Sequence, residues 1–264
     1  MRNFIEKIFI GLFIYTFATS SYAASSQAAT EIHYSLQEII NFSKQVERSL
    51  AEKGARVFIV SRVGRPVDEL PRGFNYTHTG IGVYSIITTA DGQKIPGYTM
   101  YNLYQKDGQA NKSELVQDYP VDFFSGVHKL KAGIIIPKPA LQKRILQVIN
   151  SDTYENLHNP KYSAISNPFN TTYQNCTEHT LDVLNAAIYN TSNIALLKTN
   201  SKEYFNAQKV KVNPFKMLLG SMFSSEISIN DHDERVETAT FTTIGKYLEK
   251  YDLVEEQYSI SLQQ

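Results

Sequence analysis

The chain has 264 residues, with 26 Lys and Arg against 26 Asp and Glu, and a formal net charge of zero at neutral pH. This balance gives no basic face of the kind that nucleic acid requires, so nucleic acid is not an expected partner. The single cysteine, Cys176, cannot form a disulfide within the chain. The fold is therefore expected to be stable by core packing alone.

The first 23 residues have the pattern of a signal peptide. A basic start is followed by an apolar run from Ile8 to Ala18 and then by small residues before Ala24. The apolar run is too short for a permanent transmembrane helix. We therefore predict cleavage after Ala23, a periplasmic or secreted protein, and no stable membrane span after cleavage. Residues 24–264 show no internal boundary and are predicted to form one domain.

The first predicted elements are a helix, a strand and a loop. Residues 35–52 carry apolar side chains at helical spacing, and Gly54 is a typical helix stop. Residues 55–63 are rich in β-branched residues and predict a strand buried on both faces. Glycine and proline punctuate residues 64–74, which predicts a loop.

A β-hairpin is predicted over about 76–105, with Asp91 and Gly92 in its turn. Residues 132–137 predict another short buried strand. Residues 140–150 predict a helix, because their apolar side chains gather on one side. The polar segment 152–172 predicts a long loop.

The C-terminal third predicts four further elements. Residues 176–189 have the periodicity of a helix, and the apolar segment 213–223 predicts a second helix that packs in the core. Residues 236–243 predict a last strand, and residues 244–251 predict a short last helix.

Cys176 is expected at the first position of its helix. Asn175 is a good N-cap, and Glu178 could reach back to the cap's own N–H in a capping box. The free N–H groups of a helix start favour a thiolate, which is the activation that a cysteine nucleophile requires. The alternative is an inert buried cysteine, since free cysteines are among the most buried residues.

His78 is the strongest candidate for a base among the six histidines. It lies at the start of the hairpin, where Gly80 and Gly82 leave room for a close approach. The alternative is an ordinary half-buried strand histidine. His179 is expected to support or pack near Cys176. The remaining histidines fall in predicted loops or at the surface: His33, His128, His158 and His232.

The order of these motifs resembles a known group of enzymes. A histidine strand, His78-Thr-Gly-Ile-Gly, that precedes an Asn175-Cys176 helix resembles the circularly permuted papain-like proteins, which include lecithin-retinol acyltransferase relatives and permuted NlpC-type peptidases. That acyltransferase branch has Asn-Cys-Glu-His, whereas this chain has one residue more between Cys176 and His179. Three blocks, "ARVFIVSRVGRPVDELPRGFNYTHTGIGVYS", "PGYTMYNLYQ" and "YQNCTEHTLDVLNAA", resemble the bacterial domain-of-unknown-function family 2145, over about residues 42–251.

The resemblance implies an α+β, circularly permuted papain-like (NlpC-type) fold, in which an antiparallel sheet packs against helices and the cysteine begins a helix. It implies Cys176 as nucleophile and His78 as general base. A third polar residue would orient the histidine. Asn102 is our choice, with Gln105 as the alternative.

Arg65, Tyr76 and Asn175 are the expected substrate-binding residues. The loop that carries Arg65 could equally be a solvated loop with a few salt bridges. No cofactor or metal is expected, because Cys176 and His179 form only half of a zinc site.

The sequence thus predicts an exported cysteine hydrolase that cleaves an amide through an acyl-thioenzyme. The expected partner is a peptide, a peptidoglycan fragment or another acyl substrate. Two alternatives stay open: a lipid acyltransferase or thioesterase, and a non-catalytic envelope binding protein. The sequence does not indicate the oligomeric state.

Overall fold

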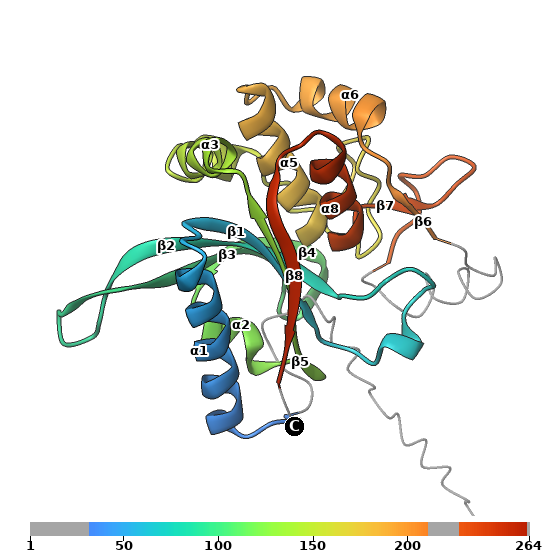
Figure 1. Ribbon diagram of the computed structural model, residues 1–264. Helices are drawn as coiled ribbons and strands as arrows, with labels where there is room; N and C mark the ends of the chain where they lie inside the picture. The colour runs from blue at the N-terminus through green and yellow to red at the C-terminus, as the bar shows by residue number, and fades with distance from the viewer. Residues whose placement is uncertain (1–31, 211–226, 263–264) are drawn as a thin grey trace, which may run out of the picture.

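The computed structural model describes residues 32–210 and 227–262, and within them the chain folds around one six-stranded antiparallel sheet (Figure 1). The strand order is β4-β3-β2-β1-β5-β8. These strands are β1 (Val57–Val63), β2 (His78–Thr88), β3 (Lys94–Lys106), β4 (Gln109–Asp118), β5 (Lys129–Pro137) and β8 (Val254–Ser261). A separate two-stranded sheet joins β6 (Gln208–Lys209) to β7 (Glu237–Thr238). The class is mixed α+β, as predicted.

Helices cover both faces of the large sheet (Figure 1). Helices α1 and α2 lie on one face, whereas α3, α5 and α8 lie on the other, with α6 packed on α5. The helices are α1 (Leu36–Glu52), α2 (Pro120–Ser125), α3 (Pro139–Ile149), α4 (Thr153–Asn156), α5 (Cys176–Tyr189), α6 (Ile194–Tyr204) and α8 (Phe241–Lys250), with a 3-10 turn η1 (Val67–Glu69). No helix among the described residues is long and apolar enough to cross a membrane.

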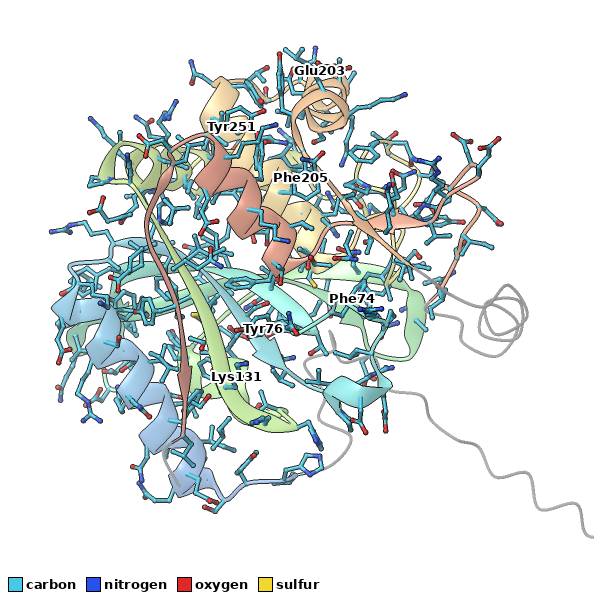
Figure 2. All side chains as sticks on the ribbon, turned by 45° about the vertical axis from the view of Figure 1, so that its right-hand side comes forward. Phe74, Tyr76, Lys131, Glu203, Phe205 and Tyr251 are labelled. Carbon is cyan, nitrogen blue, oxygen red and sulfur yellow. The ribbon has the colours of Figure 1, made fainter. Side chains whose placement is uncertain are left out.

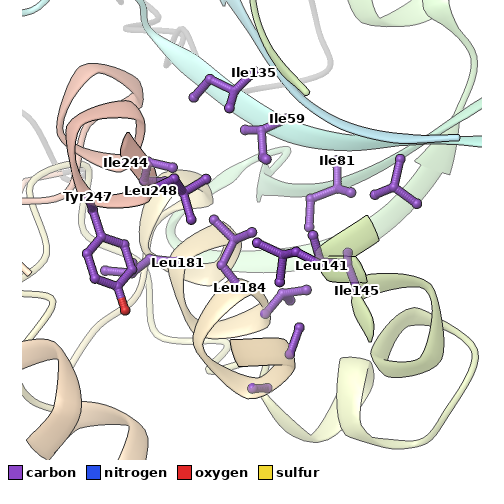
Figure 3. Close-up of a cluster of buried hydrophobic side chains, with 14 of the residues drawn as sticks. Ile59, Ile81, Ile135, Leu141, Ile145, Leu181, Leu184, Ile244, Tyr247 and Leu248 are labelled. Carbon is purple, nitrogen blue, oxygen red and sulfur yellow. The ribbon is translucent and has the colours of Figure 1, made fainter. Parts of the chain in front are cut away.

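Strand β1 divides the core into two layers, because successive side chains of a strand point to opposite faces. Val57 and Ile59 pack with α3, α5 and α8, in the cluster shown in Figure 3. Phe58 and Val60 pack with α1 and α2. All seven residues of β1 are buried, as expected for a strand covered on both faces.

Local sequence explains the boundaries of the first elements. Ser35 accepts the Glu38 N–H at 3.3 Å, and the Glu38 carboxylate accepts the Ser35 N–H at 2.8 Å. This capping box begins α1. Gly54 adopts φ +61° just after the helix ends. Gly92 adopts φ +82° in the turn between β2 and β3, so the predicted hairpin is confirmed.

Other elements differ from the prediction. The predicted strand 236–243 is wrong beyond Thr238, because the Thr240 hydroxyl caps α8 and residues from Phe241 onward are helical. The predicted loop 152–172 contains the short helix α4. The sequence did not predict β4, β8, α2 or α6. The signal peptide and the predicted helix 213–223 lie outside the described residues.

A buried ionic cluster ties α6 to α5. Lys198 Nζ lies 2.7 Å from Glu178 Oε1 and 2.8 Å from Asp182 Oδ2. Burial raises the pKa of Glu178, an effect that the Lys198 charge opposes. The two carboxylates raise the pKa of Lys198, so the ammonium stays charged against its burial.

Lys198→Met should reduce the free energy of unfolding by about 3–5 kcal/mol, because it leaves buried carboxylates without their cation. The loss should be larger at pH 8 than at pH 5. Without Lys198 the carboxyl groups bind protons more tightly in the folded state, and that contribution disappears as pH rises. Urea denaturation at both pH values measures this loss of unfolding free energy. Lys202→Met, on the exposed face of the same helix, is the matched control, and equal losses for the two variants would contradict the account.

Candidate active site

Cys176 is the first residue of α5, and Asn175 is its N-cap. The Asn175 side-chain oxygen accepts the Glu178 N–H at 2.9 Å. The second half of the predicted capping box is wrong. The Glu178 carboxylate instead accepts hydrogen bonds from Lys198 and from the Ser166 hydroxyl, because a buried carboxylate is stabilised more by a cation than by one amide.

The thiol of Cys176 is buried, with 4 % of the residue exposed. Its Sγ lies 3.8 Å from the Thr177 hydroxyl oxygen, and the backbone of Thr79 hydrogen-bonds to it. Burial raises the pKa of Cys176, while these hydrogen bonds and the charge of Arg62 oppose the rise. The expectation of a helix-stabilised thiolate is therefore wrong in the resting protein, since desolvation outweighs the donors at the helix start.

His78 lies at the start of β2, with 1 % of its surface exposed. Its Nε2 lies 3.1 Å from Asn102 Oδ1, and its Nδ1 has no hydrogen-bond partner among the described residues. An amide oxygen only accepts, so Nε2 carries the proton and Nδ1 keeps a lone pair. Burial, and then the charge of the neighbouring Arg62, hold the pKa of His78 well below its ordinary value. The imidazole is therefore neutral at pH 7.

Asp118 at the end of β4 orients the amide that holds His78. Asn102 Nδ2 donates to Asp118 Oδ1 at 2.8 Å, and the Tyr104 hydroxyl donates to Asp118 Oδ2 at 3.0 Å. The Tyr104 ring stacks on the imidazole of His78 at 4.7 Å, with 13° between the planes. Burial raises the pKa of Asp118 to about 7.

The structure distinguishes Asn102 from Gln105 as the partner of His78, and it corrects the role expected of Gly80. Asn102, not Gln105, contacts His78, because the Gln105 amide donates to the Ala110 carbonyl at 2.7 Å across the turn after β3. The space expected beside Gly80 is filled by the Asn102 side chain, which a Cβ at that position would meet. Gly80 thus permits the His78–Asn102 contact and is not an opening for a ligand.

Cys176 and His78 are linked through Thr79, and no hydrogen bond joins the thiol to the imidazole. His78 points to the sheet face covered by α1 and α2, where it lies 5.5 Å from the Phe123 ring. Cys176 belongs to α5, on the opposite face, and meets the sheet at the backbone of Thr79. The thiol therefore lies against the residue that directly follows His78.

A cavity of about 180 Å³ opens at Cys176. Arg65, Tyr76 and Asn175, the three predicted binding residues, line it together with the cysteine, whereas His78 does not. Figure 2 labels Tyr76 and Phe74 on the segment that leads into β2. The described lining residues are Arg65, Leu70, Pro71, Phe74, Tyr76, Thr77, Tyr162, Ala164, Ile165, Asn175, Cys176, Thr177, Ile227, Ala239, Thr240 and Phe241.

The other histidines lie in separate environments. The His179 ring lies 5.0 Å from Tyr154 and 6.4 Å from His158, and burial lowers the pKa of His179 to about 3. His232 is not at the surface as predicted: 1 % of its side chain is exposed, and its Nε2 lies 2.9 Å from the Ile165 carbonyl oxygen. Within the described ranges, no group of three or more His, Cys, Asp or Glu side chains could hold a metal ion.

Sequence reasoning missed several residues of the site. Asp118 and Tyr104 support His78 and Asn102, and Arg62 lies opposite His78 in the β1–β2 register. Asp118 could have been found only by extending the hairpin into a third strand, because residues 109–118 alternate weakly. Phe241 lines the cavity from α8, but it fell in a segment predicted as a strand.

Comparison with known proteins defines the family. Residues 49–248 match the model of a family described as "Uncharacterized protein conserved in bacteria (DUF2145)", and the chain belongs to this family. No curated protein and no solved structure matches the chain. The predicted membership of this bacterial family is confirmed.

Alkylation of Cys176 by iodoacetamide should follow a thiol pKa above the ordinary value of about 8.5, because burial opposes the thiolate. The rate should rise with pH through that value and show no plateau at pH 5–6. Arg62→Met should move the profile to still higher pH, since it removes a nearby positive charge. Arg56→Met, which changes the arginine directly before β1, is the control. A fast, pH-independent reaction at pH 5–6 would contradict the neutral resting thiol.

Proposed function

We propose that this protein is a cysteine hydrolase, in which Cys176 attacks the carbonyl carbon of an amide and His78 is the general base. The observation that carries the proposal is the neutral, buried imidazole of His78, whose Nδ1 has no partner among the described residues and which directly precedes the strand residue that contacts the thiol. A lone pair held in one tautomer by Asn102 is the property that a general base requires.

The proposed reaction begins from a neutral thiol and a neutral imidazole. As Sγ bonds to the carbonyl carbon, Nδ1 of His78 takes the thiol proton. The carbonyl oxygen becomes an oxyanion, which backbone N–H groups at the start of α5 can stabilise. The imidazolium then donates its proton to the leaving amine, the C–N bond breaks, and an acyl-thioester remains on Cys176.

Hydrolysis completes the cycle. Water attacks the thioester carbonyl while Nδ1 of His78 accepts its proton, and the acid leaves as the thiol regains the proton. The sequence requires the thiol and the imidazole to come into contact when the substrate is bound. In the resting protein the two side chains approach β2 from opposite faces at Thr79, so the contact requires a side chain to move around the start of β2, beyond the shortening of catalytic hydrogen bonds that substrate binding commonly causes.

Resemblance supports the same chemistry. The order of a histidine strand, an amide-bearing strand and a cysteine helix is that of the permuted papain-like hydrolases. The N-terminal sequence favours action outside the cytoplasm, on a peptide or a cell-envelope peptide. Arg65, Tyr76 and Asn175 are proposed to contact the substrate, because they line the cavity that contains the thiol.

Acyl transfer or thioester cleavage is a second candidate function. It is favoured by the cavity walls, where Leu70, Phe74 and Phe241 present apolar surface. Both functions pass through the same acyl-thioenzyme, and they differ in the leaving group and in the final acceptor.

Incubation with a panel of peptide amides, peptidoglycan fragments and acyl thioesters should give a mass increase of one acyl group at Cys176. Cys176→Ala should abolish both the adduct and turnover. His78→Gln should slow acylation by about 10²–10⁴-fold, the usual value of a general base. His158→Gln, which changes a half-buried histidine outside the cavity, should leave the rate unchanged. Turnover that survives Cys176→Ala would overturn the proposal.

Acylation should also fall below about pH 7, where Asp118 becomes protonated. The carboxylate accepts hydrogen bonds from both Asn102 and Tyr104, and protonation removes one acceptor site from this arrangement. The pH profile of kcat/KM measures this acidic limb. Asp118→Asn should lower the rate and remove the limb, whereas a limb that persists in this variant would assign it to another group.

A further inference from the structure

The cavity at Cys176 has mostly apolar walls. Phe74 and Tyr76 come from the segment before β2, and Phe241 comes from the first turn of α8. Leu70 and Ile165 complete this surface. Among the described lining residues, Arg65 is the only charged side chain. The other polar groups are amides and hydroxyls: Asn175 and Thr177 flank the thiol in sequence, and Tyr76, Thr77, Tyr162 and Thr240 come from other segments.

The size of the cavity limits what can fill it. Its volume is about 180 Å³. An apolar cavity of about 150 Å³ binds benzene. A group the size of one aromatic ring, or a short alkyl chain, therefore fits beside the thiol, whereas most of a long lipid chain would lie outside the cavity.

The wall is held in place from behind by the sheet. The Tyr76 and Phe241 rings meet edge to face, with 4.8 Å between their centroids. A Cβ at Gly133 of β5 would lie 2.6 Å from Tyr76 Cζ and 2.7 Å from Phe241 Cε1. Glycine at this position therefore lets both rings pack against the strand. Because both rings are packed against the sheet, they fix the shape of this side of the cavity.

We propose that the acyl group transferred to Cys176 is small and apolar: a short alkyl chain or a single aromatic or leucine-sized side chain next to the carbonyl. This inference rests on the proposed function and narrows its substrate class. It disfavours acyl donors with charged side chains, because apolar walls do not compensate the desolvation of a charge. It also disfavours long-chain lipids, because of the cavity's volume.

Alkyl methanethiosulfonates test the cavity without any need for turnover. The thiolate of Cys176 attacks the reagent's sulfenyl sulfur, a disulfide bond forms, and methanesulfinate leaves. Methyl, benzyl, decyl and 2-sulfonatoethyl reagents are compared, and each rate is divided by the rate with free glutathione. The benzyl reagent should have a relative rate about tenfold above the other three, because only its ring both fits and buries apolar area.

Substitutions in the cavity wall should change the order of the relative rates of the four reagents. Ala164→Leu, which narrows the cavity, should remove the preference for benzyl. Phe74→Ala, which removes a half-buried ring, should raise the relative rate of the decyl reagent. Tyr204→Ala, which removes an exposed ring outside the cavity, is the control and should leave the order unchanged. Equal relative rates for all reagents, or a preference for the sulfonate, would overturn the inference.

The two proposals can fail separately. If the protein prefers the benzyl reagent but forms no acyl-enzyme, the inference of a small apolar cavity stands and the proposed hydrolase function is overturned. If an acyl-enzyme forms at equal rates from small, long and charged donors, the proposed hydrolase function stands and the inference of a small apolar acyl group is overturned. Gly133→Ala adds a second check, because it should push the rings of Tyr76 and Phe241 into the cavity and slow the benzyl reagent selectively.

Discussion

The site depends on the buried hydrogen bond between His78 and Asn102. Asn102 can hold the imidazole because Asp118 accepts its amide N–H, so strands β2, β3 and β4 must keep one register for the contact to exist. A register shift of one residue would send Asn102 to the other face of the sheet. Gly80 is part of the same constraint, because a larger side chain would take the space of the Asn102 amide. The fold thus fixes the tautomer of His78 as well as its position.

The same burial that orders His78 also keeps the resting pair uncharged. Desolvation lowers the pKa of the histidine and raises that of Cys176, and the charge of Arg62 adds to the first effect and opposes the second. A preformed thiolate–imidazolium pair is therefore disfavoured before a substrate arrives. Under the proposed function, the proton would leave the thiol during its attack on the carbonyl.

Sequence reasoning placed the elements that carry Cys176 and His78 better than the residues around them. The helix that starts at Cys176 and the strand that starts at His78 follow from local patterns: a good N-cap, and β-branched residues interrupted by glycine. Asn102 could be paired with His78 only as one of two choices, because hairpin register is a tertiary property. Asp118 was missed because β4 alternates weakly. The thiol's pKa was predicted in the wrong direction, because a helix start is visible in the sequence and the depth of burial is not.

The most direct test is ¹⁵N NMR of the protein labelled at its histidines, with His78 assigned by comparison with His78→Gln. We expect a neutral imidazole at pH 7 with its proton on Nε2, which persists below the pH at which an ordinary histidine becomes charged, because burial lowers the pKa of His78. Asn102→Ala should release this tautomer preference. An imidazolium at pH 7, or a proton on Nδ1 in the native protein, would contradict the claim that His78 is held ready to accept the proton of Cys176.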